Sequence, residues 1–134
     1  YFDLVPFCPE VAIGLGVPRA PIRLIQGTHG TRARGVSDLA FDVTDRLAAY
    51  AEKVAAELRD VSGYIFKADS PSCGMQGVPV HDANGAPVMV GVGIYAATFM
   101  RLLPELPFED EGRLTDPVTR EHFIERVLVY RRSR

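Results

Sequence analysis

The chain has 134 residues, of which 47% are hydrophobic and 24% are charged, and its formal net charge is −2. This length and composition are typical of one globular domain and exclude a largely disordered chain. The small net charge gives no strong attraction to nucleic-acid polymers or anionic membranes, and no apolar run reaches the roughly 18 residues of a membrane span. We therefore expect no nucleic-acid polymer and no membrane among the partners, and leave a homo-oligomer open.

The first 40 residues predict two short strands separated by loops. Residues 2–7, "FDLVPF", form an apolar run whose proline favours an edge strand or a strand end. The stretch 9–21 is rich in glycine and proline, which is typical of a loop. Residues 22–27, "IRLIQG", alternate and predict a second strand, whereas residues 28–38 show no period and are expected to form a mobile loop.

The middle of the chain predicts a helix followed by a strand. Apolar residues recur at helical spacing between residues 42 and 59, with Asp42 as the expected N-cap. A short link then leads to the strand candidate 64–67, "YIFK". A strand, a helix and a strand in this order favour a parallel βαβ unit. The apolar face of the helix consists of Val43, Leu47, Tyr50, Val54 and Leu58.

The last third predicts a hairpin and two helices. Asn84-Gly85 is a strong turn signal between two extended runs at 78–91. Residues 94–103 are apolar nearly all round and predict a buried helix that ends at Pro104, and the following residues read as a linker. Asp116 followed by Pro117 predicts the start of the final helix, which runs to the last residue without a C-cap glycine.

These elements together indicate an α/β fold. We expect a single small Rossmann-like domain with a mostly parallel sheet and flanking helices, spanning residues 1–110, and a C-terminal helix or joint at 111–134. In such sheets, binding sites lie in the loops at the carboxyl ends of the strands. The segments "FCPE" (7–10) and "KADSPSCG" (67–74) both follow predicted strands, so they are expected at the same edge of the sheet.

The only two cysteines, Cys8 and Cys73, both lie in these proline-restrained turns. A single cysteine is about as often a small buried hydrophobe as a reactive group. Two rigidly held thiols at one edge of a sheet instead favour metal or cluster ligation, because a thiolate ligand must be fixed and stabilised. Two cysteines are too few for a secreted disulfide scaffold and for a four-thiolate site, so we expect a reduced, cytoplasmic protein.

The segments "FCPEVAIGLGVPRAPIRL" and "KADSPSCG", with a helix between them, resemble the family of bacterial 2-thiouracil desulfidases. The resemblance extends from Tyr1 to about Leu103. It implies a [4Fe–4S] cluster held by three cysteines, whose open iron accepts sulfur from a thiocarbonyl base such as 2-thiouracil. Cys8 and Cys73 match two of these ligands. The third belongs to a Cys-Leu-Leu-Gly turn that this sequence lacks, so either an N-terminal segment precedes residue 1 or this form carries no cluster.

The same resemblance suggests roles for the polar neighbours of the two cysteines. Ser70 and Glu10 are candidates for proton handling or for positioning water, although turn residues of these types often only bond the backbone. Lys67 and Arg19 could steady the charge of a cluster or a substrate, although a solvated surface position is equally compatible with the sequence. The segment "EGRL" (111–114) and the following helix resemble the joint to a second, C-terminal domain found in some family members.

The sequence thus favours an iron–sulfur enzyme that desulfurates a small thiocarbonyl compound, and two other interpretations stay open. One is a cluster-binding or redox-sensing module without turnover. The other is an inert α/β interaction domain that retains two cysteines. The histidines His29, His81 and His122 match no metal-binding motif and are expected to be solvent-facing or satisfied by hydrogen bonds.

Overall fold

The structure is a computed structural model, and it describes residues 22–27, 30–36, 38, 40–58, 61–67, 70–82 and 84–133. Its elements follow the order strand, strand, helix, three strands, helix, strand, 3₁₀ turn and helix. The predicted strand at 2–7 lies outside the described residues. The elements are β1 (Ile22–Gly27), β2 (Gly30–Gly35), α2 (Thr44–Glu57), β3 (Tyr64–Phe66), β4 (Val78–His81), β5 (Pro87–Gly91), α3 (Ile94–Leu102), β6 (Phe108–Asp110), η1 (Arg113–Thr115) and α4 (Pro117–Arg132).

The larger sheet is mixed, so the expectation of a mostly parallel, Rossmann-like sheet is not confirmed. Its four strands lie in the order β2-β1-β4-β5, and only the central pair, β1 and β4, is parallel. The two outer pairs are antiparallel hairpins, because short connections cannot return a strand to a parallel neighbour. The predicted hairpin around Asn84-Gly85 is therefore confirmed. The mobile loop expected at 28–38 is wrong, since β2 occupies most of it and pairs with β1 along its whole length.

A second, two-stranded sheet pairs β3 with β6 in parallel. The strand β3 confirms the prediction for "YIFK", but β6 lies in the stretch expected to be a linker. Only three residues form β6, which is too short for a clear periodic signal. β1 and β3 belong to different sheets, so β1 is not the first strand of the predicted parallel βαβ unit. The other strand predicted before the helix, at 2–7, lies outside the described residues, so a unit that begins there stays a prediction.

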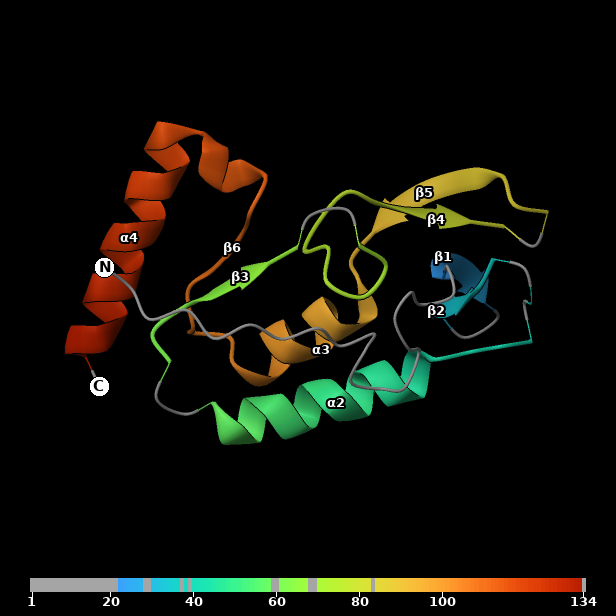
Figure 1. Ribbon diagram of the computed structural model, residues 1–134, viewed down its shortest axis with the longest axis horizontal. Coiled ribbons are helices and arrows are strands. Elements are labelled where there is room, and N and C mark those ends of the chain that lie inside the picture. Colours follow the sequence, from blue (N-terminus) through green and yellow to red (C-terminus); the bar gives the residue numbers. More distant parts are fainter. Residues whose placement is uncertain are drawn as a thin grey trace.

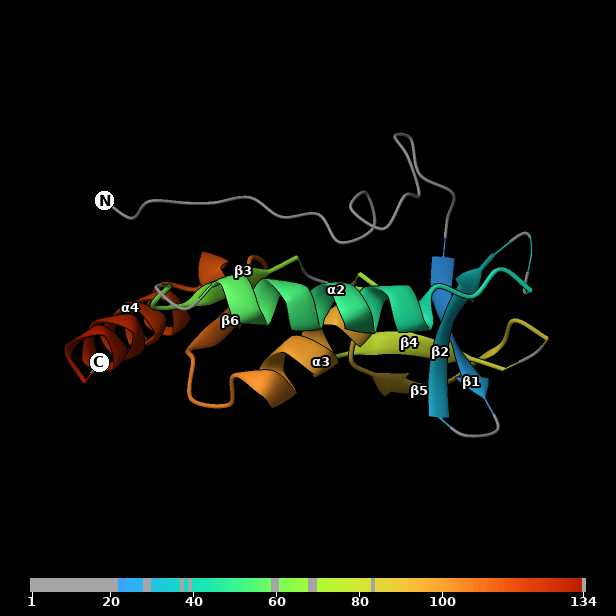
Figure 2. The same ribbon diagram turned by 90° about the horizontal axis from the view of Figure 1, so that it is seen from below.

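The helices α2 and α3 lie side by side and connect the two sheets (Figures 1 and 2). An aliphatic cluster joins the beginning of α2 to β1, β2 and β4, and includes Leu24, Leu47 and Val80. An aromatic cluster joins the rest of α2 to α3, β3 and the turn after β3, and includes Phe66 and Tyr95. The larger sheet lies at one end of the molecule and α4 at the other (Figure 1).

The start of α2 differs by one residue from the prediction. Val43 is the N-cap, without a side-chain cap, and Asp42 precedes it. The Asp42 carboxylate accepts hydrogen bonds from Arg32 Nε at 2.9 Å, Arg34 Nε at 3.1 Å and the backbone N–H of Thr44 at 2.9 Å. Burial alone would raise the pKa of Asp42, but the bonds from Arg32 and Thr44 outweigh it and hold the pKa well below its usual range.

The final helix begins as predicted. Asp116 is the N-cap of α4, and its carboxylate accepts bonds from the backbone N–H and the hydroxyl of Thr119 at 3.1 and 2.8 Å. Pro117 occupies the first turn, where its missing N–H leaves no helical bond unmade. None of the helices among the described residues has the length and apolar character needed to cross a membrane.

Candidate functional site

The segment Ser70–Gly74 forms a tight turn between β3 and β4. The Ser70 hydroxyl oxygen accepts hydrogen bonds from the backbone N–H groups of Ser72 and Cys73, both at 3.2 Å. The backbone N–H of Gly74 donates to the Ser70 carbonyl at 2.8 Å. One serine thus closes the turn from its side chain and from its backbone, as short polar residues do in turns.

The same turn is bonded to the beginning of α3. The N–H groups of Gly93, Ile94 and Ala96 donate to the carbonyls of Gly74, Pro71 and Ser72 at 2.7, 3.1 and 3.0 Å. The first N–H groups of a helix have no partner within the helix, so the turn satisfies three donors that would otherwise need water. The turn is therefore fixed to a rigid element by backbone bonds that do not depend on charge.

Two glycines allow this close approach. A Cβ atom on Gly93 would lie 2.5 Å from the carbonyl carbon and oxygen of Ser72 and 2.9 Å from the nitrogen of Cys73. A Cβ atom on Gly74 would lie 2.3 Å from Val78 Cγ2 and 2.8 Å from the Ser70 carbonyl oxygen. Backbone atoms cannot move away as a flexible side chain can, so both positions require glycine.

Cys73 is buried, with 8% of its surface exposed, and a hydroxyl donates to its sulfur. Ser72 is fully buried, and its Oγ donates to Cys73 Sγ at 3.7 Å while lying 2.9 Å from the Ser70 Oγ. Because Ser72 has one proton, its bond to the sulfur leaves Ser70 as the donor in the serine pair. A line of hydroxyls therefore runs from Ser70 through Ser72 to Cys73. Sequence reasoning missed Ser72, although its place between a fixed proline and the cysteine was a usable signal.

Two tyrosines, the buried Tyr95 and the half-buried Tyr64, face each other in the aromatic cluster that contains Cys73. The hydroxyls of Tyr64 and Tyr95 lie 2.8 Å apart, and Tyr95 directly precedes Ala96, whose N–H is bonded to the turn. Burial raises the pKa of Tyr64 to about 12, the bond with Tyr95 opposes this, and negative charge on Cys73 adds to it. Local sequence patterns could not predict this pair, because its members come from different elements.

The structure brings together only some of the candidate site residues. Ser70 and Cys73 share the turn, as expected. Lys67 is two-thirds exposed, and its ammonium group lies 3.6 Å from the Glu111 carboxylate at the surface. The other three candidates, Cys8, Glu10 and Arg19, lie outside the described residues. The shared site of Cys8 and Cys73 therefore stays a prediction.

Cys73 meets the requirements of one thiolate ligand, because its sulfur is held in a rigid turn and accepts a hydrogen bond. Among the described residues, no three side chains of histidine, cysteine, aspartate or glutamate gather at one point. His81 has a hydrogen-bond partner, as expected, because its Nδ1 lies 3.3 Å from the Leu24 carbonyl oxygen. A cluster at Cys73 would need further ligands from outside the described part of the chain.

The α/β architecture and the cysteine turn agree with a comparison to known families. The sequence profile of the 2-thiouracil desulfurase family matches residues 1–111, and the chain belongs to this family. The match includes the whole Ser70–Gly74 turn and ends just after β6.

Two similar proteins were found. The chain is 34% identical over 97 residues to the uncharacterised protein YbbK of Bacillus subtilis (strain 168), an alignment that covers 67% of this chain and 63% of that protein. A solved structure, the [4Fe-4S]-dependent thiouracil desulfidase TudS, superimposes with a TM-score of 0.56 at 30% identity and covers 81% of this chain and 68% of its own. The chain thus spans somewhat less than two thirds of the curated relative it matches.

Proposed function

We propose that the protein is a [4Fe–4S]-dependent enzyme that removes sulfur from 2-thiouracil or a similar small thiocarbonyl compound in the cytoplasm. The observation that supports this most directly is the fixed position of Cys73 in a turn that belongs to the desulfurase family match. The likeness to TudS, whose dependence on a [4Fe–4S] cluster is known, supports the choice of cofactor.

The reaction exchanges the sulfur of a C=S bond for the oxygen of water. The sulfur leaves as sulfide, the ring carbon gains a carbonyl oxygen, and no electron is gained or lost overall. When bound, a cluster with an open iron position would supply a Lewis acid with high affinity for sulfur. Cys73 and Cys8 would provide two of its thiolate ligands, and a third ligand would complete the set.

The described side chains would support the ligand and move protons. Ser72 would keep its hydrogen bond to the Cys73 sulfur, which orients the thiolate and stabilises its charge. The Ser70 hydroxyl accepts two backbone bonds and donates its own proton to Ser72, which would hold the Ser72 hydroxyl in place for its bond to the sulfur. Ser70 is also our first candidate for handling a proton of the substrate or for positioning water. Glu10 is our second candidate for activating water, and Lys67 and Arg19 are candidates for balancing charge around the cluster and the substrate.

The test uses the protein with its native sequence at both ends, purified without oxygen and reconstituted with iron and sulfide. We expect an absorbance band of iron–thiolate charge transfer and the release of sulfide from 2-thiouracil, with uracil as the second product. Two compounds serve as controls: uracil, which has the ring but no sulfur, and thiourea, which has a C=S bond but no ring. A protein that binds no iron would contradict the whole proposal. A protein that binds the cluster but releases no sulfide would instead be a cluster-binding or redox module.

A further inference from the structure

A second polar region lies between β6 and α4. It surrounds a cavity of about 340 Å³, which falls at the small end of the range for ligand sites. Four of its lining residues, Arg113, Thr119, His122 and Arg126, come after residue 111, where the family match ends. The other lining residues, Met75, Phe108 and Glu109, lie within the family match, so the cavity is formed where the matched part meets the C-terminal segment. A ligand site here does not depend on the proposed function.

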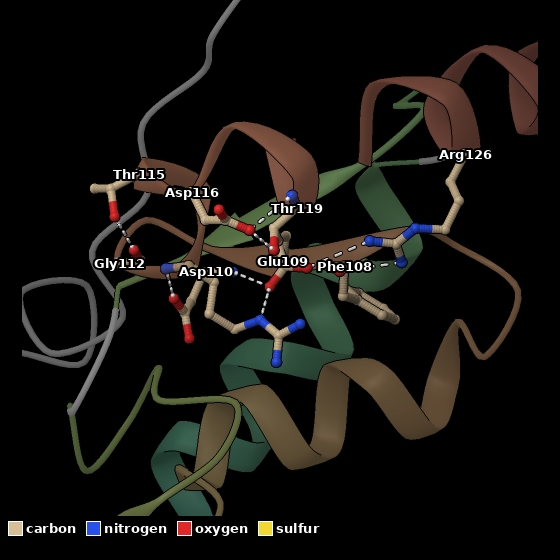
Figure 3. Close-up of polar contacts among 9 residues, drawn as sticks. Phe108, Glu109, Asp110, Gly112, Thr115, Asp116, Thr119 and Arg126 are labelled. Carbon is tan, nitrogen blue, oxygen red and sulfur yellow. Dashed lines mark hydrogen bonds and ion pairs between the residues drawn. The ribbon is translucent and has the colours of Figure 1, made fainter. Parts of the chain in front are cut away.

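The base of the cavity is one buried carboxylate between two arginines. Glu109 has 3% of its side chain exposed, and its oxygens lie 2.8 Å from Arg113 Nε and 3.4 Å from Arg126 Nη2. Figure 3 shows Arg126 reaching Glu109 and the Phe108 carbonyl together, the latter at 3.4 Å. Two guanidinium groups face the Glu109 carboxylate, and the neighbouring Asp110 carboxylate accepts the backbone N–H of Arg113 at 2.7 Å. An anion would therefore be bound by the N–H donors of the arginines rather than by an excess of positive charge.

The arginines retain donors for a ligand. Each guanidinium has five N–H donors, and within the described residues Arg113 uses only Nε on Glu109. Both side chains are about half exposed, so their remaining N–H groups face water. Because Glu109 already fixes their orientation, little side-chain entropy is lost when they bind a second oxyanion.

The other walls differ in character. Met75 and Phe108 give the cavity apolar surface, and Thr119 and His122 also line it. Flat apolar surface next to paired guanidinium groups is complementary to an aromatic ring that carries an oxyanion. Met75 lies two residues after Cys73, so a ligand here would contact the segment that bears the cysteine.

We propose that the cavity between β6 and α4 binds a small aromatic compound that carries a phosphate or a carboxylate group. The oxyanion would lie between Arg113 and Arg126, opposite the Glu109 carboxylate, and the ring would lie on Phe108 and Met75. Binding would weaken as salt rises, because half-exposed guanidinium groups are screened.

NMR titration of the whole chain tests this, using phenyl phosphate, benzoate and benzyl alcohol as probes. We expect saturable shifts of the Thr119 and Phe108 amides and of the Arg113 side chain with one or both anions, and none with benzyl alcohol. Equal shifts with benzyl alcohol would overturn the oxyanion role. The absence of any shift at about 10 mM, an affinity too weak for a specific site, would overturn the site itself.

A pair of variants locates the binding. Arg126→Gln should weaken phenyl phosphate binding about tenfold, since a charge-assisted hydrogen bond is lost. Arg131→Gln is the matched control, because Arg131 lies on the same helix and does not line the cavity. Equal effects of the two substitutions would show that only general charge attracts the probe and would overturn the proposal. If Arg126→Gln does not fold, the comparison of the three probes on the unchanged chain still decides.

Discussion

The turn at Cys73 and the joint between β6 and α4, which Glu109, Arg113 and Arg126 form, are both built around a buried polar side chain, but they are held by different forces. The turn is fixed by bonds among backbone N–H groups, carbonyls and serine hydroxyls. The joint is fixed by two ion pairs whose arginines are about half exposed. Neutral bonds to a helix end depend little on salt or pH, whereas half-exposed ion pairs depend on both.

The difference fits the tasks that we assign to the two regions. A metal ligand must keep its geometry under all conditions, and a turn bonded to the first residues of α3 provides that. A binding site for an exchangeable anion needs charge that stays partly accessible, and the joint provides that. The following predictions test whether the two regions are as separate as their interactions suggest.

Loss of the Cys73 thiol should have the largest effect. Cys73→Ser should abolish sulfide release from 2-thiouracil and reduce iron content, because serine is a poor ligand for cluster iron. Ser72→Ala, which removes only the hydroxyl that bonds the sulfur, should reduce activity by about tenfold. Full activity in Cys73→Ser, with unchanged circular dichroism, would show that the turn is structural only.

A methyl group at Gly93 should break the contact between the turn and α3. Gly93→Ala places a Cβ atom 2.5 Å from the backbone of Ser72, so we expect a loss of about 2–3 kcal/mol in the free energy of unfolding. Gly77→Ala is the control, because its Cβ atom would meet nothing within 4 Å, although its φ of +66° makes alanine less favourable by about 1–2 kcal/mol. Urea unfolding measures both. A smaller loss in Gly93→Ala than in Gly77→Ala would mean that the turn adapts easily.

Removal of the Glu109 carboxylate should affect the joint and spare the turn. Glu109→Ala leaves Arg113 and Arg126 without their shared partner, but both can reach water, so we expect a loss of only about 1–2 kcal/mol. Hydrogen exchange should show faster opening of α4 and unchanged protection of the amides of Cys73 and Ala96. High salt should weaken protection of α4 in the unchanged protein and have little further effect in the variant. Faster exchange in both regions would show that they are coupled.

The sequence predicted those parts of the fold that depend on local pattern. The helix face from Val43 to Leu58, the hairpin at Asn84-Gly85 and the Asp116 cap all follow from spacing and turn chemistry within a few residues. The strands β2 and β6 were missed because long-range pairing stabilises them: β2 is polar and glycine-rich, and β6 is three residues long.

The candidate site shows the same limit. The turn around Cys73 was recognisable from "SPSCG", since proline, serine and glycine have strong local preferences. Its attachment to Gly93 and its closeness to Tyr64 and Tyr95 were not, because these partners lie on other elements. Lys67 was a candidate because it is close to the cysteine in sequence, and sequence distance could not show that its ammonium group lies 3.6 Å from the Glu111 carboxylate at the surface.

The smallest expected effect concerns pH and the Tyr64–Tyr95 pair. The pKa of Tyr64 is about 12 in the folded protein, against an ordinary value of 10.0, so between these values the folded state holds a proton that the unfolded state has lost. The pair therefore contributes its full stability below about pH 10, and this stability decreases as the pH rises toward 12.

Tyr64→Phe should lower the free energy of unfolding by about 1 kcal/mol at pH 7 and make its decrease between pH 10 and 12 less steep. Urea unfolding at several alkaline pH values, together with tyrosinate absorbance, measures this. An unchanged slope in the variant would mean that Tyr64 is more accessible to water than its contacts with Tyr95 and Phe99 indicate.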